Sequence, residues 1–377
     1  MVVVWGMGKL FRVLSFPVVF GEVLGGILVG PLVLNIVDPG SVSIQVLAEL
    51  GIFFLMLHAG LETDPQALLK GSRKAILVAI GGVLLPLIGG FYVSQYLGYD
   101  LIKSLFIGTA ISATSIAISV RILKDCHIRN TTFANKVLNA ALISDIIILI
   151  IFSAVIKLVE NGAVNASELI FLLIKIILFF AVVLVAGFKL SKYSGKFLKN
   201  KGFTFTLIIA LFLGLVAEWI GLHVIIGAFL AGLFIHEEIL YGKTYKKIED
   251  RIYGISYGFL GPIFFTSLAF NLDFKGLMEE PMIFLMLFGV AFLGKFLGSY
   301  IMAMLQKIQP MKSVLLGLTM NSRGAVDLVI ISIGLKYRII DQQIFSILVV
   351  LAFATTLLSI IAIRILKKRV RFKVLRR

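Results

Sequence analysis

Long apolar stretches, separated by short polar segments or by glycine and proline, follow one another along almost the whole chain. Most of them approach the ~20 residues that an α-helix needs to cross the hydrocarbon core of a bilayer. The pattern predicts an all-α integral membrane protein with about 13 transmembrane helices. The predicted spans cover residues 2–14, 16–37, 43–61, 75–97, 101–123, 134–157, 167–190, 203–220, 222–236, 252–270, 281–305, 313–336 and 344–366.

The composition supports a membrane protein without a large soluble part. Hydrophobic residues make up 59% of the 377 residues and charged residues 15%, whereas soluble proteins carry about 25% charged residues. We therefore expect one transmembrane domain over residues 1–366, followed by a basic cytoplasmic tail over residues 367–377. Cys126 is the only cysteine, which excludes an intrachain disulfide and a thiolate metal site. No cleavable signal peptide is evident.

The distribution of positive residues predicts the orientation in the membrane. If the C-terminus is cytoplasmic and the predicted spans alternate, 28 of the 36 Lys and Arg residues fall on the cytoplasmic side. This asymmetry predicts a multi-pass plasma-membrane protein with its N-terminus outside. The net charge of +16 is then explained by orientation and by contact of the tail with anionic lipid. Membrane lipid is the expected partner, and nucleic acid is not.

The chain resembles itself at a displacement of about 206–211 residues. Residues 16–26 align with 222–232, and the motif at 52–54 aligns with the one at 263–265. We therefore predict a first repeat over about 1–160, a linker helix over about 167–190 and a second repeat over about 203–366. A single intervening helix places the two repeats in opposite orientation. Inverted repeats are typical of transporters whose substrate site lies near the midplane of the membrane.

Asp145 lies near the middle of a predicted span, between Ser144 and a run of isoleucine and leucine. A charge at this depth costs about 2.5–3.5 kcal/mol even on a lenient scale, so it requires a reason. Asp145 either belongs to a structural ion pair or holds a proton and a small cation in turn. Lys295 is equally deep, and it is either a counter-charge for Asp145 or Asp327 or a second titrating group. Other acidic residues, such as Glu22, fall near predicted helix ends.

Polar segments interrupt two predicted spans near mid-depth. They cover residues 108–115 and 319–324, and at the displacement above Thr114 falls near Gly324. Interrupted helices that meet at mid-membrane offer free carbonyls and helix-dipole ends to an ion. Hydroxyls in apolar helices can instead bond only to their own backbone. Arg323 and Asp327 are spaced i, i+4, which predicts either an ion pair between them or a contact from Asp327 to Lys295.

Five segments together resemble the second monovalent cation/proton antiporter family, the NapA/Kef-type exchangers. They are residues 16–31, 112–119, 144–145, 294–295 and 320–326, and the resemblance spans nearly the whole chain. It implies a NapA/NhaA-like fold with two crossed discontinuous helices. It also implies a homodimer in which a six-helix core moves like an elevator against a dimerisation domain.

Matched by position, the resemblance implies that Asp145 is the ion-binding aspartate and Lys295 the core lysine. It further implies that Thr114 and Ser115 are the polar residues of the broken helix. We add Ser144 as a neighbouring ligand of the cation or proton, and Arg323 and Asp327 as charge-compensating or proton-carrying groups. The only metal ion expected at Asp145 is the transported monovalent cation.

Ser144 departs from the family pattern. The residue before the aspartate is usually Asp in electrogenic members and Asn or Gln in others, so the usual carboxylate partner of the lysine is missing here. We therefore expect electroneutral exchange of one proton per monovalent cation. Kef-type systems add a large nucleotide-binding domain, which we expect to be absent because the chain ends about ten residues after the last predicted span. The sequence does not decide whether a separate cytosolic protein regulates the transporter.

The sequence thus predicts a secondary transporter that exchanges protons for Na⁺, with K⁺ or Li⁺ as alternative cations. A sodium-coupled symporter of an organic anion on a related fold is the alternative function, and a channel is a third. No nucleophile–base pair, metal cluster or phosphate-cradling loop points to an enzyme. No cofactor is expected, because Na⁺ or K⁺ and H⁺ are the transported ions.

Overall fold

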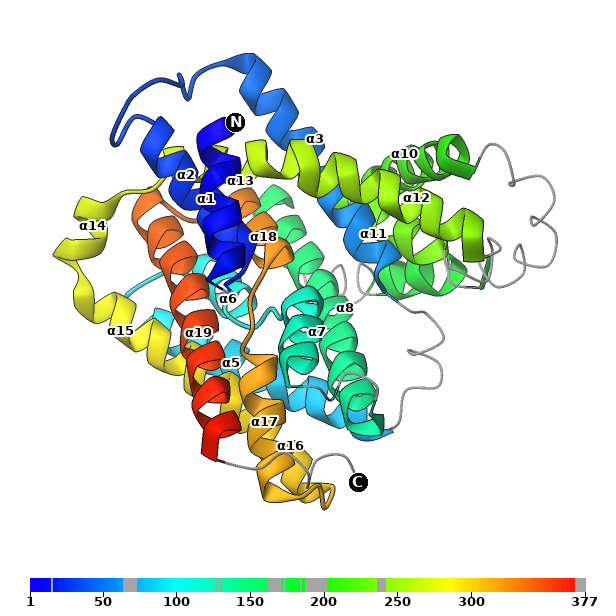
Figure 1. Cartoon of the computed structure of the whole chain (residues 1–377), viewed down its shortest axis with the longest axis vertical. Helices are drawn as coiled ribbons and strands as arrows, with labels where there is room; N and C mark the ends of the chain where they lie inside the picture. The colour runs from blue at the N-terminus through cyan, green and yellow to red at the C-terminus, as the bar shows by residue number, and fades with distance from the viewer. Residues whose placement is uncertain are drawn as a thin grey trace. The chain divides into compact units, whose positions relative to one another are not determined.

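The computed structural model describes residues 1–14, 16–63, 73–126, 128, 131–161, 171, 174–183, 185–186, 202–235 and 242–369 (Figure 1). Within these ranges the regular structure is entirely helical. Among the described residues, seven helices are long and apolar enough to cross a membrane, or up to eight if one bent pair counts as a single span. The prediction of an all-α membrane protein is confirmed, whereas the count of 13 is not. Several predicted spans are represented by shorter apolar helices, such as Val18–Val29 and Val224–Phe234.

The chain divides into two compact units, each built from two separate stretches. Unit 1 comprises Met1–Pro65 and Ile156–Phe270, and unit 2 comprises Gln66–Val155 and Asn271–Arg377. From residue 370 onward, the predicted basic tail lies outside the described residues. Of the predicted linker helix, the described part includes the apolar helix Ile174–Val183.

Unit 1 contains seven labelled α-helices. The α3 helix packs on α11 and α13, while α2 packs between α1 and α13 and α10 packs on α11. A π-helical turn at Ser256–Leu260 joins α12 to α13, and the Ser256 hydroxyl donates a 2.8 Å hydrogen bond to the Phe54 carbonyl of α3. The bounds are α1 Val2–Val13, α2 Val18–Val29, α3 Val42–Leu61, α10 Gly202–Ile220, α11 Val224–Phe234, α12 Gly242–Ile255 and α13 Gly261–Phe270.

Unit 2 contains the remaining labelled helices. The α5 helix packs on α6 and α16, α16 packs on α17, and both α17 and α18 pack on α19. The long α8 helix begins in unit 2 and ends in unit 1. The bounds are α5 Arg73–Tyr96, α6 Leu101–Ala110, α7 Ile116–Asp125, α8 Thr132–Asn161, α14 Phe274–Glu279, α15 Pro281–Gly289, α16 Lys295–Leu305, α17 Pro310–Met320, α18 Ala325–Lys336 and α19 Gln342–Arg369.

Both interruptions predicted from the polar segments are present in unit 2. The predicted span 101–123 consists of α6 and α7, and the predicted span 313–336 consists of α17 and α18, which are bent by 41° (Figure 1). The first half of each broken helix packs against the second half of the other, since α6 contacts α18 and α17 contacts α7. The two breaks therefore lie at the same place in the unit.

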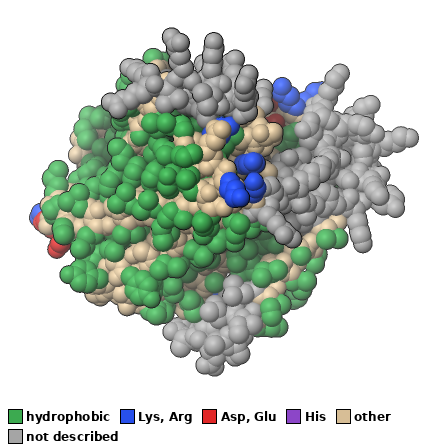
Figure 2. Space-filling model, turned by 90° about the horizontal axis from the view of Figure 1, so that it is seen from below, with side chains coloured by type: hydrophobic (Ala, Val, Ile, Leu, Met, Phe, Trp, Pro, Cys, Tyr) green, Lys and Arg blue, Asp and Glu red, His purple; other side chains and the backbone are tan. Residues whose placement is uncertain are grey.

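Hydrophobic side chains are the most common type among the described residues on the face shown in Figure 2, as expected of a surface in contact with lipid tails. Glu22 corrects one expectation from the sequence. It lies in the interior of α2 and is only 4% exposed, rather than at a helix end. Gly8 of α1 faces it, and the missing side chain at that glycine leaves room for the Glu22 stem.

Two glycines allow α3 and α11 to touch through their backbones. A Cβ atom added at Gly60 would lie 2.0 Å from the Phe229 carbonyl oxygen, and one added at Gly232 would lie 2.1 Å from the Leu57 carbonyl oxygen. Small residues at such crossings are typical of helices that associate inside a membrane, where close packing replaces the hydrophobic effect.

We therefore expect Gly60→Ala and Gly232→Ala each to lower the free energy of unfolding by about 1–3 kcal/mol, because the added methyl overlaps backbone atoms. Gly254→Ala in α12 is the matched control, since nothing lies within 4 Å of its Cβ position. Alanine is favoured over glycine in a helix by about 1 kcal/mol, so the control should not lose stability. Thermal unfolding of the purified variants in detergent measures the difference. Wild-type stability in the first two variants would contradict a tight crossing.

Candidate cation-binding site

The two breaks of unit 2 bind each other through polar groups. The Ser115 amide donates a 2.8 Å hydrogen bond to the Ser322 carbonyl. The hydroxyl oxygens of Ser119 and Ser322 lie 3.0 Å apart, and both side chains are fully buried. Irregular backbone at membrane depth is tolerated only where protein or water satisfies its hydrogen bonds. The contact between Ser115 and Ser322 satisfies part of the hydrogen bonding of the irregular backbone at the two breaks.

The carbonyl end of α6 is bound by both positive side chains that lie deep in the predicted spans. Arg323 donates from Nη1 to the Ala110 carbonyl at 3.1 Å and from Nη2 to the Ile111 carbonyl. Lys295 donates from Nζ to the Ser112 carbonyl. The C-terminal end of a helix carries partial negative charge, so cations are favoured there. This end of α6 explains how two cations are accommodated in a buried site.

Arg323 is also held by α19. Its backbone amide donates to the Thr356 hydroxyl at 2.9 Å, and its Nε donates to the Thr355 hydroxyl at 3.1 Å. The sequence analysis missed this threonine pair. The available signal was two adjacent hydroxyl residues inside the otherwise apolar span 344–366.

Asp327 caps the helix that it begins. One carboxylate oxygen, Oδ2, accepts a 2.8 Å hydrogen bond from the Gly324 amide at the start of α18, and Oδ1 is buried without a hydrogen-bond partner. In the described part of the chain, Asp327 forms no ion pair within 4.0 Å with Arg323 or with Lys295. Both pairings predicted from the sequence are therefore absent as direct contacts. Arg323 turns toward the end of α6, while Asp327 turns toward the backbone of its own helix.

Asp145 lies in the middle of α8 and is 5% exposed. Its charge interacts with those of Asp327 and Lys295. Among the described side chains, however, no cation lies within 4.0 Å of it, and its Oδ1 atom has no hydrogen-bond partner. The structure therefore leaves this carboxylate without a fixed counter-ion.

Among the described residues, four buried oxygen atoms without a hydrogen-bond partner belong to Asp145, to the two breaks and to the first turn of α18. They are Thr114 Oγ1, Asp145 Oδ1, Asn321 Oδ1 and Asp327 Oδ1. A buried polar atom without a partner costs about 1–3 kcal/mol, so such a set calls for a ligand. Hard cations prefer oxygen ligands of these types. The described residues contain no cluster of three or more His, Cys, Asp or Glu side chains that could hold a metal ion.

Ser115 and Ser144 use their hydroxyls locally. The Ser115 oxygen accepts a 3.4 Å hydrogen bond from the Ile118 amide and caps α7. The Ser144 hydroxyl donates a 2.8 Å hydrogen bond to the Ala140 carbonyl one turn earlier in α8. Both contacts are the common backbone bonds of hydroxyl residues in or near helices. Cation binding by these two serines stays a prediction.

Asn321 is a residue of the site that the sequence analysis did not single out. Its Nδ2 donates a 3.0 Å hydrogen bond to the Phe292 carbonyl. Phe292 lies in a π-helical turn, Val290–Gly294, that immediately precedes Lys295. Such turns often occur at functional sites because they redirect the residues that follow. The polar character of the segment 319–324 was a signal for Asn321, but nothing in the sequence pattern marked the π-turn.

Arg323→Gln is expected to destabilise the protein, because it leaves the carbonyls of Ala110 and Ile111 without a donor at about 1–3 kcal/mol each. Arg323→Lys keeps the charge but not the forked donor geometry, so it should recover only part of the loss. Lys275→Gln is the control, since that lysine is 88% exposed and its contact with Glu279 is 3.9 Å long. Thermal unfolding in detergent ranks the three variants. If Arg323→Gln matched Lys275→Gln, the carbonyl contacts would not contribute as described.

Comparison with known proteins shows similarity to sodium/proton antiporters over almost the whole chain. Residues 1–368 match the family described as "Sodium/hydrogen exchanger, transmembrane". A Na⁺/H⁺ antiporter of Enterococcus hirae is 28% identical over 95% of this chain and 94% of its own. The Na⁺/H⁺-K⁺ antiporter GerN of Bacillus cereus is 30% identical over 93% of this chain and 90% of its own.

The fold also matches a solved antiporter structure. A sodium/proton antiporter of Methanocaldococcus jannaschii superimposes with a TM-score of 0.75 at 18% identity, and the match covers 96% of this chain and 93% of the other. The predicted antiporter family is thus confirmed, while the label "second" is set aside because the matching family is that of the sodium/hydrogen exchangers. Its members are transporters, which is the class predicted in place of an enzyme. The chain belongs to the transmembrane sodium/hydrogen exchanger family.

Proposed function

We propose that this protein exchanges protons for a monovalent cation, Na⁺ first and K⁺ or Li⁺ as alternatives, and that both ions compete for Asp145. The observation that carries the proposal is the buried Oδ1 atom of Asp145. Among the described residues this atom has no hydrogen-bond partner and its carboxylate has no ion-pair partner within 4.0 Å. Membership of the exchanger family and relatives named as Na⁺/H⁺ and Na⁺/H⁺-K⁺ antiporters support the choice of ions.

The cation would be held by oxygens from four places in unit 2. Asp145 supplies the charge from α8, and Thr114 supplies a free hydroxyl oxygen from the break between α6 and α7. Asn321 and Asp327 bring further unpartnered oxygens from the second break and from α18. Ser144 and Ser115 stay candidate ligands through the second lone pairs of their hydroxyls.

Competition at one carboxylate couples the two ions because an uncompensated buried charge is costly. A protonated Asp145 is neutral, and an Asp145 that holds a monovalent cation is neutral as a pair. The empty, ionised carboxylate is the expensive state inside the membrane, so movement of the loaded site is favoured over movement of the empty one. Since one ion excludes the other, each passage carries either a proton or a cation.

Lys295 and Arg323 are proposed to compensate charge rather than to travel with a proton. Both donate hydrogen bonds to the carbonyl end of α6, and neither forms an ion pair with a described carboxylate within 4.0 Å. Their charges then stay constant through the cycle. Together with Ser144 in place of an acidic residue, this favours one proton exchanged per cation.

We further propose that unit 2 is the moving element of an elevator mechanism and that unit 1 forms the homodimer interface. All the site residues belong to unit 2. The unit boundaries after Pro65 and after Phe270 recur at nearly the displacement of the sequence repeat, which supports two inverted repeats. The proposal includes 13 spans, an external N-terminus, a cytoplasmic C-terminus and a plasma-membrane location.

Replacing Asp145 by asparagine keeps the shape of the side chain but removes the charge that both ions neutralise. Asp145→Asn is therefore expected to reduce cation-dependent collapse of a proton gradient in liposomes to the level of protein-free vesicles. The assay is run with Na⁺, K⁺ and Li⁺ in turn. Asp38→Asn is the control, because Asp38 is an exposed loop residue of unit 1 whose side chain accepts a hydrogen bond from the Gly40 amide.

Wild-type exchange by Asp145→Asn would refute competition at this carboxylate. Cation-dependent uptake of an organic anion without proton movement would instead favour the sodium-coupled symporter. Each variant is first compared with the wild type by its elution from a sizing column, so that a failure to fold is recognised separately.

The proposed stoichiometry predicts that membrane potential does not alter exchange. One elementary charge moving across the membrane is worth about 2.3 kcal/mol per 100 mV, so an electrogenic cycle would respond strongly. Na⁺/H⁺ exchange is measured in liposomes whose potential is set by a gradient of the permeant anion thiocyanate. Equal initial rates and endpoints at zero and negative potentials are expected. A dependence of the endpoint on potential would contradict one-for-one exchange.

A further inference from the structure

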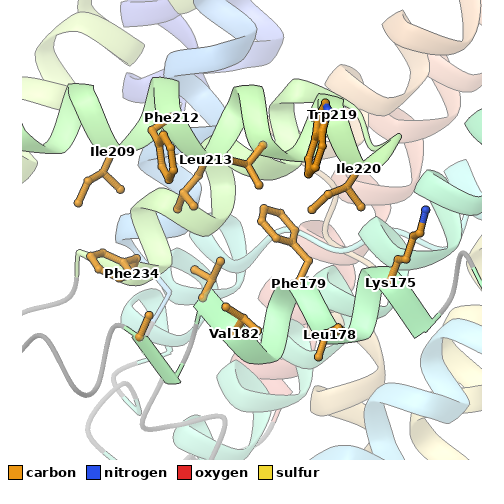
Figure 3. Close-up of a pocket in the computed structure, with 13 residues that line it drawn as sticks. Lys175, Leu178, Phe179, Val182, Ile209, Phe212, Leu213, Trp219, Ile220 and Phe234 are labelled. Carbon is orange, nitrogen blue, oxygen red and sulfur yellow. The ribbon is translucent and has the colours of Figure 1, made fainter.

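Unit 1 contains an apolar groove whose lining includes none of the residues of the proposed ion site. It has a volume of about 800 Å³ and runs between the helix Ile174–Val183 and α10, with Phe234 at one end (Figure 3). Residues from Ile209 to Ile220 line it along one face of α10, at the i, i+3, i+4, i+7 spacing of a helix stripe. The facing helix contributes a similar stripe that includes Phe179 and Val182.

The end of the groove opposite Phe234 has a different character. Lys175 and Trp219 both lie there, and the Lys175 ammonium is the only charged group among the lining residues (Figure 3). The Lys175 ammonium lies over the face of the Phe171 ring, 4.6 Å from the ring centroid. In the described ranges no carboxylate lies within 4.0 Å of it, and Glu218, which precedes Trp219, does not line the groove.

The length and ends of the groove fit one leaflet of a bilayer. The ten-residue step from Ile209 to Trp219 corresponds to about 15 Å of helix, which is half of the ~30 Å hydrocarbon thickness. Tryptophan and lysine are typical of the boundary between hydrocarbon and headgroups, where their polar ends reach the interface. A groove of this length with this pair at one end fits a single leaflet, from the headgroup boundary toward the midplane.

We propose that this groove binds an anionic phospholipid, with one acyl chain along the two apolar stripes and the phosphate at Lys175. A cation with no described carboxylate within 4.0 Å complements a headgroup of net negative charge. A zwitterionic headgroup would bring its own ammonium group to a groove whose described lining contains no acidic residue. A second copy of the chain is the less favoured occupant, because it would have to bury Lys175 without a described partner, and an unpaired buried charge is costly.

The two tryptophans of the chain provide a direct probe. Trp5→Phe leaves Trp219, at the charged end of the groove, as the only indole. This protein is reconstituted into phosphatidylcholine bilayers in which the same minor fraction is brominated phosphatidylglycerol or brominated phosphatidylcholine. Bromine quenches indole fluorescence on contact. We expect the anionic lipid to occupy the site about fivefold more readily, which corresponds to about 1 kcal/mol for one lysine near an anionic headgroup.

Two lysine variants in the Trp5→Phe background separate a site from general surface charge. Lys175→Gln is expected to remove the preference for the anionic lipid. Lys157→Gln is the matched control, because Lys157 forms a 2.9 Å ion pair with Glu160 and does not line the groove. Its side chain lies within 3.3 Å of where a Cβ atom of Gly221 would be, just after the same end of α10. This control should keep the preference.

Three results would overturn the proposal. They are equal quenching by the two brominated lipids, an equal loss of preference in both lysine variants, and the absence of quenching by either lipid. The third result, combined with a dimer that dissociates when Val216→Trp fills the groove, would identify a second copy of the chain as the occupant. Fluorescence quenching does not depend on ion exchange. This experiment therefore tests lipid binding independently of the proposed function.

Discussion

An interrupted helix in hydrocarbon leaves backbone carbonyls that no water can reach, and the site of this exchanger is organised around that constraint. The α6 helix ends at Ala110, and the next carbonyls cannot be satisfied by a continued helix. Arg323 and Lys295 donate to the carbonyls of Ala110, Ile111 and Ser112. Each side of this contact would be costly alone, since a buried cation and an open helix end both need a partner. Together they offset one another.

The contact between the cations and the carbonyls also determines what the acidic residues can do. If Lys295 and Arg323 formed ion pairs with Asp145 and Asp327, those carboxylates would be neutralised and less available to an ion. Instead, Asp327 bonds to the Gly324 amide with one oxygen, and one oxygen of Asp145 has no partner. The positive charges still lower the electrostatic cost of an acidic residue in this region without occupying its oxygens. The proposed competition of a proton and a cation for Asp145 would require this separation.

Hydropathy and the spacing of polar residues were sufficient to predict the helical membrane class, both broken helices and the place of Asp145 in the middle of a long apolar helix. These features follow from the cost of exposing polar groups to lipid, which acts on each segment by itself. The partners of Arg323 could not be predicted in this way, because the choice between Asp327 and the carbonyls of α6 depends on where the second helix lies. The same holds for Asn321 and the π-turn at Phe292, whose hydrogen bond joins residues 29 positions apart. Glu22 was misplaced because its space comes from Gly8 on another helix.

The construction of each unit from two distant stretches has a consequence for biosynthesis. The crossing at Gly60 and Gly232 cannot form until the ribosome has made α11, by which time α1, α2 and α3 have already left it. The α3 helix must therefore be stable in the membrane before its partners α11 and α13 exist, and its packing is a later stage than its insertion. Until then, the backbone of α3 at Gly60 is open to whatever neighbours the translocon and the lipids provide. Quality control during synthesis would accordingly meet an inserted but unassembled intermediate of about 230 residues, the length of chain that reaches Gly232.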